Sequence, residues 1–513
     1  MPEELFGRIR KTVKPQWKTC LISALLLGLA AHIYKLTNWL PNWDSLVFRQ
    51  DEQNMLHLGR WFLSAVCGLS SDYELPWLNG ILALLWIGCA AVCVCQIFHV
   101  EKKLTAGLIG GLMAVFPTVT STMTYAYVAD GYCLALLMSC IAAALLIKGG
   151  KARCAAGSLL ITLSLGIYQA YLSMTIMLLL CHLIQGLLFE DETPAASLKK
   201  AGRFLLWELI GCALYYGILQ LLLTAAGTAL SDYQGMGDTA VSVSLGTLIQ
   251  CFDRLRAFFF SFSEGVSVYN LLNGAVAVLT VVGCLIAAVK NHCFRPWYRV
   301  VLLAVYAAAL PIGASVLYLL NPSLDFHNLM TMGYSVFYLF FILLYEKEMF
   351  PAAKLAAAKN WSILVLTTAV ILNMTVLANI SYHKLQLAYE KSYGVLIRIA
   401  DRIEQTEGTA DCGEILVVGS LPGSEAYSVN FPPDMTGITD SYILRADDEV
   451  VGQSVLCSAL NDYCGTDYRF LAGDRADALK QTDMVSGMPQ WPAKGCVTVA
   501  DGVIVIKLGE ENE

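Results

Sequence analysis

The sequence predicts a polytopic α-helical membrane protein with a small α/β domain at its C-terminal end. Of its 513 residues, 57% are hydrophobic and only 15% are charged. The mean hydropathy of +0.58 is high for a soluble globular protein. Long apolar runs recur up to about residue 380, whereas the remaining residues are polar and contain short β-branched segments. The lipid bilayer is therefore expected to surround most of the chain.

The apolar runs have the length that a membrane-spanning helix requires, roughly 17 to 25 residues. We expect about eleven such helices. Their approximate spans are 19–38, 76–98, 104–123, 127–147, 154–168, 171–189, 204–227, 266–289, 299–320, 329–345 and 360–380. The fifth and sixth come from one unbroken run that is too long for a single crossing, and we divide it at Gly166-Ile167-Tyr168-Gln169. The first run resembles a secretory signal, but no small-residue cleavage site follows, so we expect it to be retained.

Lys and Arg are concentrated in alternate loops, and this bias predicts the orientation of the chain because such residues favour the cytoplasmic side. With a cytoplasmic N-terminus, the outer loops hold only Lys35, Arg49, Arg60, Arg254 and Arg256. An odd number of crossings then makes residues 381–513 extracytoplasmic. We therefore predict a membrane domain over residues 1–380 and an extracytoplasmic α/β domain over residues 381–513.

The predicted C-terminal domain begins with a polar helical stretch over residues 382–405. Residues 414–419 form a β-branched run that ends at a Gly, which predicts a strand. Residues 496–507 predict a hairpin that turns at Asp501-Gly502. In an extracytoplasmic domain, disulfides are an option for its four cysteines, although the sequence does not pair them. These are Cys412, Cys457, Cys464 and Cys496.

Several classes of chemistry are not indicated by the sequence. It contains no G-x-x-x-x-G-K-[ST] loop, no H-E-x-x-H motif and no Asp-x-Asp motif. The remaining cysteines lie mostly within apolar runs, without the spacing of metal ligands. We expect no metal or other cofactor, and the arrangement of basic residues argues against nucleic acid as a partner. A lipid-linked sugar donor fits this pattern better than a cytoplasmic nucleotide sugar.

Candidate acid–base residues lie in the first outer loop, residues 39–75. An enzyme that uses a lipid-linked donor needs a carboxylate to deprotonate the acceptor hydroxyl, because an alcohol is a weak nucleophile at neutral pH. Asp44 is the first candidate because it lies between interfacial tryptophans, and Asp51 and Glu52 are the next. The alternative interpretation is that these are solvated loop acids or helix caps.

The same loop contains apolar residues at helical spacing, which predicts an amphipathic helix in the outer interface. These residues are Met55, Leu58, Phe62, Val66 and Leu69. On the polar stripe, Arg60 can present a planar fork to a phosphate, and His57 could assist. The alternatives are a snorkelling Arg and an ordinary surface His.

Other outward-facing groups are candidates for the same substrate site. They are Asp130 with Tyr132, Tyr168 with Gln169, Asp253 with Arg254 and Arg256, Glu264, and Asp325 with His327. Each has a structural alternative. Asp130 could cap a helix, the Tyr168-Gln169 pair could satisfy backbone groups at a tight turn, and the two arginines could anchor an interfacial helix.

Short motifs in a fixed order resemble those of the bacterial Gtr-type glucosyltransferases, which are serotype-converting O-antigen modifiers and their relatives. The motifs of the first loop are Asn42-Trp43-Asp44-Ser45, Gly59-Arg60-Trp61 and Leu75-Pro76-Trp77-Leu78-Asn79-Gly80. Residues 167–171 and 382–391 are similar to that family as well. The likeness extends over most of the chain, and the order of the motifs is more specific than any one of them.

The resemblance implies a membrane glycosyltransferase with a GT-C-like fold. It implies transfer of glucose from undecaprenyl-phosphate-glucose on the outer side of the bacterial cytoplasmic membrane. Carried over by position, Asp44 is the base, with Asp51 or Glu52 in reserve, and Arg60 contacts the donor phosphate. The chain departs from related enzymes because Ser45, not a second acid, follows Asp44, and because the folded tail is not evident in the serotype-converting enzymes.

We therefore expect a polyprenyl-phosphate-linked sugar as donor and a surface polysaccharide or teichoic acid as acceptor. A lipid-linked sugar flippase or transporter is the alternative, and it should place ionisable residues deep within its helices. Here the acids gather outside, which favours surface chemistry. A non-catalytic scaffold that displays the tail would leave the polar first loop unexplained.

Overall fold

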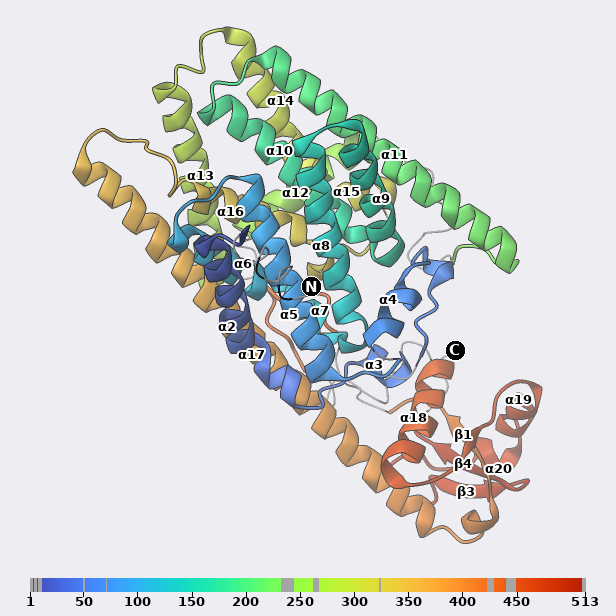
Figure 1. Cartoon of the computed structure of the whole chain (residues 1–513). Helices are drawn as coiled ribbons and strands as arrows, with labels where there is room; N and C mark the ends of the chain where they lie inside the picture. Colours follow the sequence, from blue (N-terminus) through green and yellow to red (C-terminus); the bar gives the residue numbers. More distant parts are fainter. Residues whose placement is uncertain are drawn as a thin grey trace. The chain divides into compact units, whose positions relative to one another are not determined.

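A computed structural model describes residues 3, 7, 12–48, 51–70, 72–231, 244–261, 267–322, 324–421, 429–439 and 449–509. The chain forms two compact units (Figure 1). The first contains Met1–Asn38, Gln50–Asn379 and Pro433–Gly437, and the second contains Trp39–Arg49, Ile380–Pro432 and Ile438–Glu513. Each unit therefore consists of three separate segments of the chain, and the predicted single boundary after residue 380 stays a prediction.

Helices make up the described part of the first unit. They are α2 (Pro15–Thr37), η1 (Leu56–Leu58), α4 (Leu63–Ser70), α5 (Pro76–Ile97), α6 (Lys103–Val115), α7 (Pro117–Thr124), α8 (Ala126–Lys148), α9 (Lys151–Ile167), η2 (Gln169–Tyr171), α10 (Leu172–Phe189), α11 (Pro194–Ala226), α12 (Leu245–Phe260), α13 (Val268–Lys290), α14 (Trp297–Ala314), α15 (Val316–Leu320), η4 (Asn328–Met330), η5 (Met332–Tyr334) and α16 (Ser335–Leu343). In the bundle, α2 packs against α5 and α6, and α8 packs against α5 and α9. A Cβ at Gly110 would lie 2.2 Å from the Cys20 carbonyl oxygen, so a Gly lets α6 approach α2 closely.

Within the described residues, eight helices are long and apolar enough to cross a membrane, and α6 with α7 would make a ninth. Every predicted span coincides with helical structure, which confirms a mostly helical chain with many candidate spans. However, α9 has only 17 residues, and the apolar helix Met332–Leu343 is shorter still. The number eleven and the orientation in a membrane stay predictions.

Two of the helix breaks have clear local causes. Between α6 and α7 the axis bends by 41°, because Phe116 precedes Pro117 and takes an extended backbone with φ −59° and ψ 142°. Between α9 and α10 the chain leaves the helix at Tyr168, with φ −155° and ψ 115°, and passes through η2. The predicted division of the long apolar run at residues 166–169 is therefore confirmed.

The last predicted span and the polar stretch after it form one uninterrupted helix, α17 (Ala353–Glu404), of 52 residues. Residues 353–379 of this helix belong to the first unit, and residues 380–404 belong to the second. The second unit also contains α3 (Trp43–Phe48), η6 (Thr409–Asp411), α18 (Glu449–Cys464), α19 (Asp474–Lys480) and α20 (Asp483–Ser486). Its sheet has the strand order β2-β1-β4-β3. The strands are β1 (Glu414–Val418), β2 (Arg469–Phe470), β3 (Val497–Ala500) and β4 (Val503–Lys507).

In this sheet β1 runs parallel to β2 and β4, and β3 pairs antiparallel with β4. Asp501 and Gly502 both have positive φ, 50° and 71°, as a two-residue hairpin turn requires. The predicted strand and hairpin are confirmed. All 17 cysteines of the chain fall within the described residues and are free, so the disulfides considered for the tail are not formed in this structure.

The first loop is divided between the two units. Residues 39–49 belong to the second unit, where Leu46 joins the apolar core and the Trp39 Nε1 donates to the Tyr463 hydroxyl at 3.0 Å. The expectation that residues 55–69 form one amphipathic helix was wrong. Gly59, with φ 73°, separates η1 from α4, because a left-handed residue ends the helical path.

Candidate functional site

Arg60 lies in the turn between η1 and α4, against two aromatic rings. Its Nη1 donates to the Tyr132 hydroxyl at 2.8 Å and lies 3.5 Å from the Met55 Sδ. The guanidinium carbon is 5.1 Å from the centroid of the Tyr168 ring and 5.8 Å from that of Tyr132. The two rings are stacked, with centroids 4.2 Å apart and planes 4° from parallel. This aromatic support fixes the plane of the guanidinium and attracts its charge.

The Arg60 turn is held by groups from η2 and α11. The Gln169 Nε2 donates to the Leu58 carbonyl oxygen at 2.9 Å, and the Tyr215 hydroxyl donates to the Gly59 carbonyl oxygen at 3.1 Å. A Cβ at Gly59 would lie 2.6 Å from that hydroxyl, so the turn requires a Gly. Among the predicted residues, the structure thus brings Arg60, Tyr132, Tyr168 and Gln169 together. We call these four residues the Arg60 cluster.

A buried, hydroxyl-rich helix next to the Arg60 cluster was missed in the sequence. In α7 the hydroxyl residues Thr118, Thr120, Ser121, Thr122 and Thr124 are all almost completely buried. The side chain of Thr122 hydrogen-bonds Tyr171, and the Tyr171 ring stands edge-on to Tyr168 with centroids 5.7 Å apart. The prediction treated residues 104–123 as one apolar span. The available signal was Pro117 followed by a run of Thr and Ser.

His327 precedes η4, which contacts η2. The next residue, Asn328, is bonded through its backbone N–H to the Thr436 Oγ1 at 3.1 Å. Burial lowers the pKa of His327, and the carboxylate of Asp325 partly opposes this shift. The predicted His327 therefore lies directly before an element that contacts η2, and η2 contains Gln169 of the Arg60 cluster.

Asp130 is 4% exposed, and its Oδ1 accepts a hydrogen bond from the Asn79 Nδ2 at 3.1 Å. This contact ties α8 to α5. Nearby on α5, the Asn79 Oδ1 accepts from the Leu75 backbone N–H at 3.2 Å. A substrate contact for Asp130 stays a prediction.

The sequence also gave no indication of the completely buried ion pair between Lys35 and Glu74, whose Nζ and Oε1 lie 3.6 Å apart.

The predicted acid–base residues are found in two different units. Asp44 lies in the first turn of α3, in the second unit, and its Oδ2 accepts a hydrogen bond from the Thr439 Oγ1 at 2.9 Å. Asp51 and Glu52 belong to the first unit and are exposed. His57 is exposed as well, and its carbonyl oxygen accepts from the Ser231 N–H at 2.9 Å. The pairing of Asp44 with Arg60 stays a prediction.

The two remaining outer arginines differ from each other. The Arg254 guanidinium carbon lies 4.2 Å from the centroid of the Tyr318 ring and 5.2 Å from that of Phe326, next to His327. Arg256 pairs with Asp253, Nε to Oδ1 at 3.2 Å, and both side chains are more than half exposed. Arg254 thus lies on aromatic rings whereas Arg256 is paired with a carboxylate, and a ligand contact for either stays a prediction. Glu264 lies outside the described residues.

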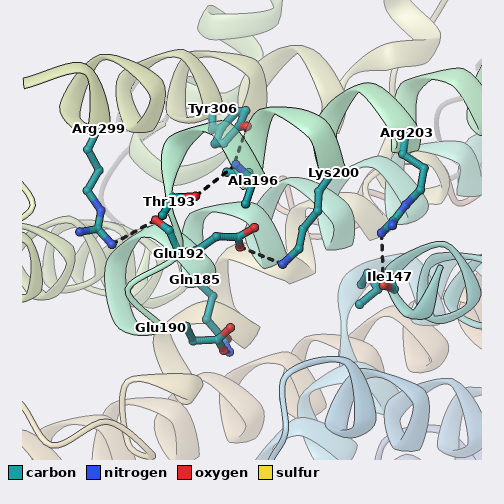
Figure 2. Close-up of polar contacts among 11 residues, drawn as sticks. Ile147, Gln185, Glu190, Glu192, Thr193, Ala196, Lys200, Arg203, Arg299 and Tyr306 are labelled. Atoms are coloured by element: carbon teal, nitrogen blue, oxygen red, sulfur yellow. Dashed lines mark hydrogen bonds and ion pairs between the residues drawn. The ribbon is translucent and has the colours of Figure 1, made fainter. Parts of the chain in front are cut away.

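A second polar network lies at the other end of α10 (Figure 2). The Arg299 Nη1 pairs with the Asp191 Oδ1 at 2.9 Å. In Figure 2 the Arg299 Nη2 donates to the Glu192 carbonyl oxygen and the Lys200 Nζ pairs with the Glu192 Oε2; these contacts measure 3.3 Å and 2.9 Å. The Arg203 Nη2 donates to the Ile147 carbonyl oxygen at 3.3 Å, near the end of α8. These contacts join cations to carboxylates and to helix ends, which is typical of structural pairing.

The described first unit is a bundle of apolar helices, and Arg60, Tyr168 and the hydroxyls of α7 gather where those helices break. The chain therefore belongs to the class of helical proteins that have many candidate membrane spans, and its polar site lies where helices break. Residues 33–345, more than half of the chain, match the model of the glucosyl transferase GtrII family, and the chain belongs to this family. It is a glycosyltransferase, as its motifs predicted. No curated protein and no solved structure gives a significant match to the chain.

Proposed function

We propose that the protein transfers a sugar from a polyprenyl-phosphate donor to a hydroxyl group of a cell-surface glycan. The family name favours glucose as the sugar. The acceptor would be a surface polysaccharide or a teichoic acid. The reaction would take place on the outer face of the bacterial cytoplasmic membrane, in a multi-pass enzyme of the GT-C class with a cytoplasmic N-terminus and an extracytoplasmic tail.

The observation that carries this proposal is the position of Arg60 on the Tyr132–Tyr168 stack. A guanidinium forms strong, charge-assisted hydrogen bonds with phosphate oxygens. When its plane is fixed in advance, it stabilises the charge that develops on the departing polyprenyl phosphate without further reorganisation. Tyr168 and Gln169 hold this geometry, and Arg254 on its own aromatic support would bind a second part of the donor.

Asp44 is the proposed general base. Its carboxylate would accept the proton of the acceptor hydroxyl as that oxygen attacks the anomeric carbon. The hydrogen bond from Thr439 orients one oxygen of this carboxylate, and α3 is fixed in the second unit through Leu46. Asp51 and Glu52 are the reserve candidates, and His57, Asp130, Arg256 and His327 stay proposed substrate contacts. The proposal requires no metal.

The test uses purified full-length protein, radiolabelled undecaprenyl-phosphate-glucose and membranes that contain candidate acceptors. Wild type is compared with Asp44→Asn and Arg60→Gln, and with Arg153→Gln as a matched control. Arg153 is an exposed residue at the end of α9 that lies away from η2. We expect label to move to the acceptor with wild type and the control, and much less with the two variants.

Unchanged transfer by Asp44→Asn would remove Asp44 as the base. If wild type transferred no sugar to any acceptor but moved the lipid-linked sugar across vesicle membranes, the flippase would replace the transferase. Membership in a glucosyl transferase family favours transfer between these two.

A further inference from the structure

A short segment of the tail, Pro433–Gly437, belongs to the first unit, although the residues on both sides of it belong to the second. We call this segment the strap. It lies well beyond residue 345, where the match to the family ends. Its contacts with the bundle are therefore a feature that the family match does not describe.

The strap is bonded to α7 and to η4. The Thr436 carbonyl oxygen accepts a hydrogen bond from the Ser121 Oγ at 3.0 Å, and the Thr436 Oγ1 accepts from the Asn328 backbone N–H at 3.1 Å. The Asp434 carbonyl oxygen accepts from the Asn328 Nδ2 at 3.1 Å. Ser121 and Asn328 are both buried, so the strap supplies partners to polar groups that water does not reach.

Gly437 fits closely against His327. Its φ is +71°, and a Cβ on this residue would lie 2.4 Å from the His327 Nδ1. This nitrogen is buried, and within the described part of the chain it has no hydrogen-bond partner. The end of the strap therefore has room for a Gly and for no larger residue.

The two elements that the strap joins both adjoin the Arg60 cluster. On α7, Thr122 follows Ser121 directly and hydrogen-bonds Tyr171, whose ring stands edge-on to Tyr168. The η4 turn, which contains Asn328, contacts η2. A further hydroxyl contact, Thr118 Oγ1 to Thr331 Oγ1 at 3.0 Å, joins α7 to the residue after η4. A displacement of α7 or η4 would consequently displace Tyr168.

We propose that Thr436 is a positioning residue for sugar transfer. By joining α7 to η4, it fixes the Tyr168 ring on which the Arg60 guanidinium lies. Thr436 does not itself touch the donor. This inference rests on the proposed role of Arg60, and it extends the transferase site to a part of the tail that follows the family match.

The first test replaces Thr436 in the full-length protein. Thr436→Val removes the hydroxyl acceptor with little change of shape, and Thr436→Ser keeps it. Thr466→Val is the matched control, because Thr466 is a partly buried Thr whose hydroxyl donates to a side chain, the Asn461 Oδ1 at 2.8 Å, within the second unit. We expect kcat/KM for the donor to fall about fivefold in Thr436→Val, a usual effect of losing one hydrogen bond. Thr436→Ser and Thr466→Val should stay close to wild type.

A second measurement does not depend on substrate. Amide hydrogen exchange of residues 165–172 should be faster in Thr436→Val than in wild type or Thr466→Val, because η2 loses support. Unchanged exchange there would overturn the inference even if transfer fell. If wild type transferred no sugar but exchange rose as expected, the proposed function would fail while the coupling through the strap would stand.

The third test uses two Gly residues with the same backbone angle. Gly465 has φ +71°, as Gly437 does, but a Cβ on Gly465 would meet nothing within 4 Å. Gly437→Ala should therefore lower transfer and raise exchange at residues 165–172, whereas Gly465→Ala should do neither. Equal behaviour of the two variants would mean that the contact with His327 is not important, and would overturn the role of the strap.

Discussion

Two polar networks lie at opposite ends of α10, and they are built differently. Next to Leu172, where the helix begins, Arg60 lies on stacked Tyr rings beside the buried hydroxyls of α7. Beyond Phe189, where the helix ends, Lys200 is paired with the Glu192 carboxylate (Figure 2), and Arg299 is paired with the Asp191 carboxylate.

The difference indicates separate roles. An ion pair satisfies both charges within the protein, and its loss appears mainly as lost stability. An Arg that is oriented by aromatic rings is in contrast prepared to meet an anion that arrives from outside the protein. The four predictions that follow test this distinction, in order of decreasing expected effect.

Arg60→Lys should have the largest effect, a loss of roughly 100-fold in kcat/KM for the donor, since oriented donors at developing charge contribute that much. Lys keeps the charge but loses the planar fork and the stacking on Tyr168. Transfer assays with the polyprenyl-phosphate donor measure this loss, and thermal unfolding should change little. A variant with full activity would show that Arg60 is held on the rings for structural reasons alone.

Arg299→Leu should show the opposite pattern. It removes the bonds from a buried guanidinium to the Asp191 carboxylate and the Glu192 carbonyl oxygen. The bond to the Glu192 carbonyl oxygen contributes about 1.5–3 kcal/mol, and the bond to Asp191 contributes less because that side chain is 94% exposed. We expect the unfolding temperature in detergent to fall while transfer per folded molecule stays unchanged. Strong loss of transfer without loss of stability would contradict the comparison.

His327 should make stability depend on pH. Burial holds its pKa in the folded protein below the ordinary value of 6.5, so the unfolded chain binds more protons in this range. The contribution of the neutral His327 to the free energy of unfolding is fully present above pH 6.5 and is lost as the pH falls below this value. The unfolding temperature should decline less steeply from pH 7.5 to 5.5 in His327→Gln than in wild type. An identical pH profile for the two proteins would contradict this assignment.

Much of the fold could be predicted because it depends on local patterns. The length of apolar runs gave the helix positions, and the break at Tyr168 followed from a run too long for one crossing. The Asp501-Gly502 turn has positive φ at both residues, which this pair favours in a hairpin. These features depend on a few neighbouring residues, and for that reason the sequence contains them.

The parts of the site that could not be predicted depend on distant residues. Trp39 bonds Tyr463, 424 positions later, so nothing near Asp44 indicated that its loop belongs to the second unit. The contact of Thr436 with Asn328 spans 108 positions. Topology placed Arg60 and Tyr168 on the same side of the predicted membrane, but only side-chain packing shows the stack beneath the guanidinium.

Lys200→Gln should have the smallest effect and tests whether all cations of the second network are equivalent. The Lys200 side chain is 35% exposed, against 8% for Arg299, and exposed ion pairs contribute about 0–1 kcal/mol. The unfolding temperature should therefore fall much less than in Arg299→Leu, and the small difference from wild type should shrink further at high salt, since salt screens exposed pairs. If Lys200→Gln instead matched Arg299→Leu in stability, burial of the cation would not be what separates the two variants. If it matched Arg60→Lys in transfer, the division between a structural and a functional end of α10 would have to be abandoned.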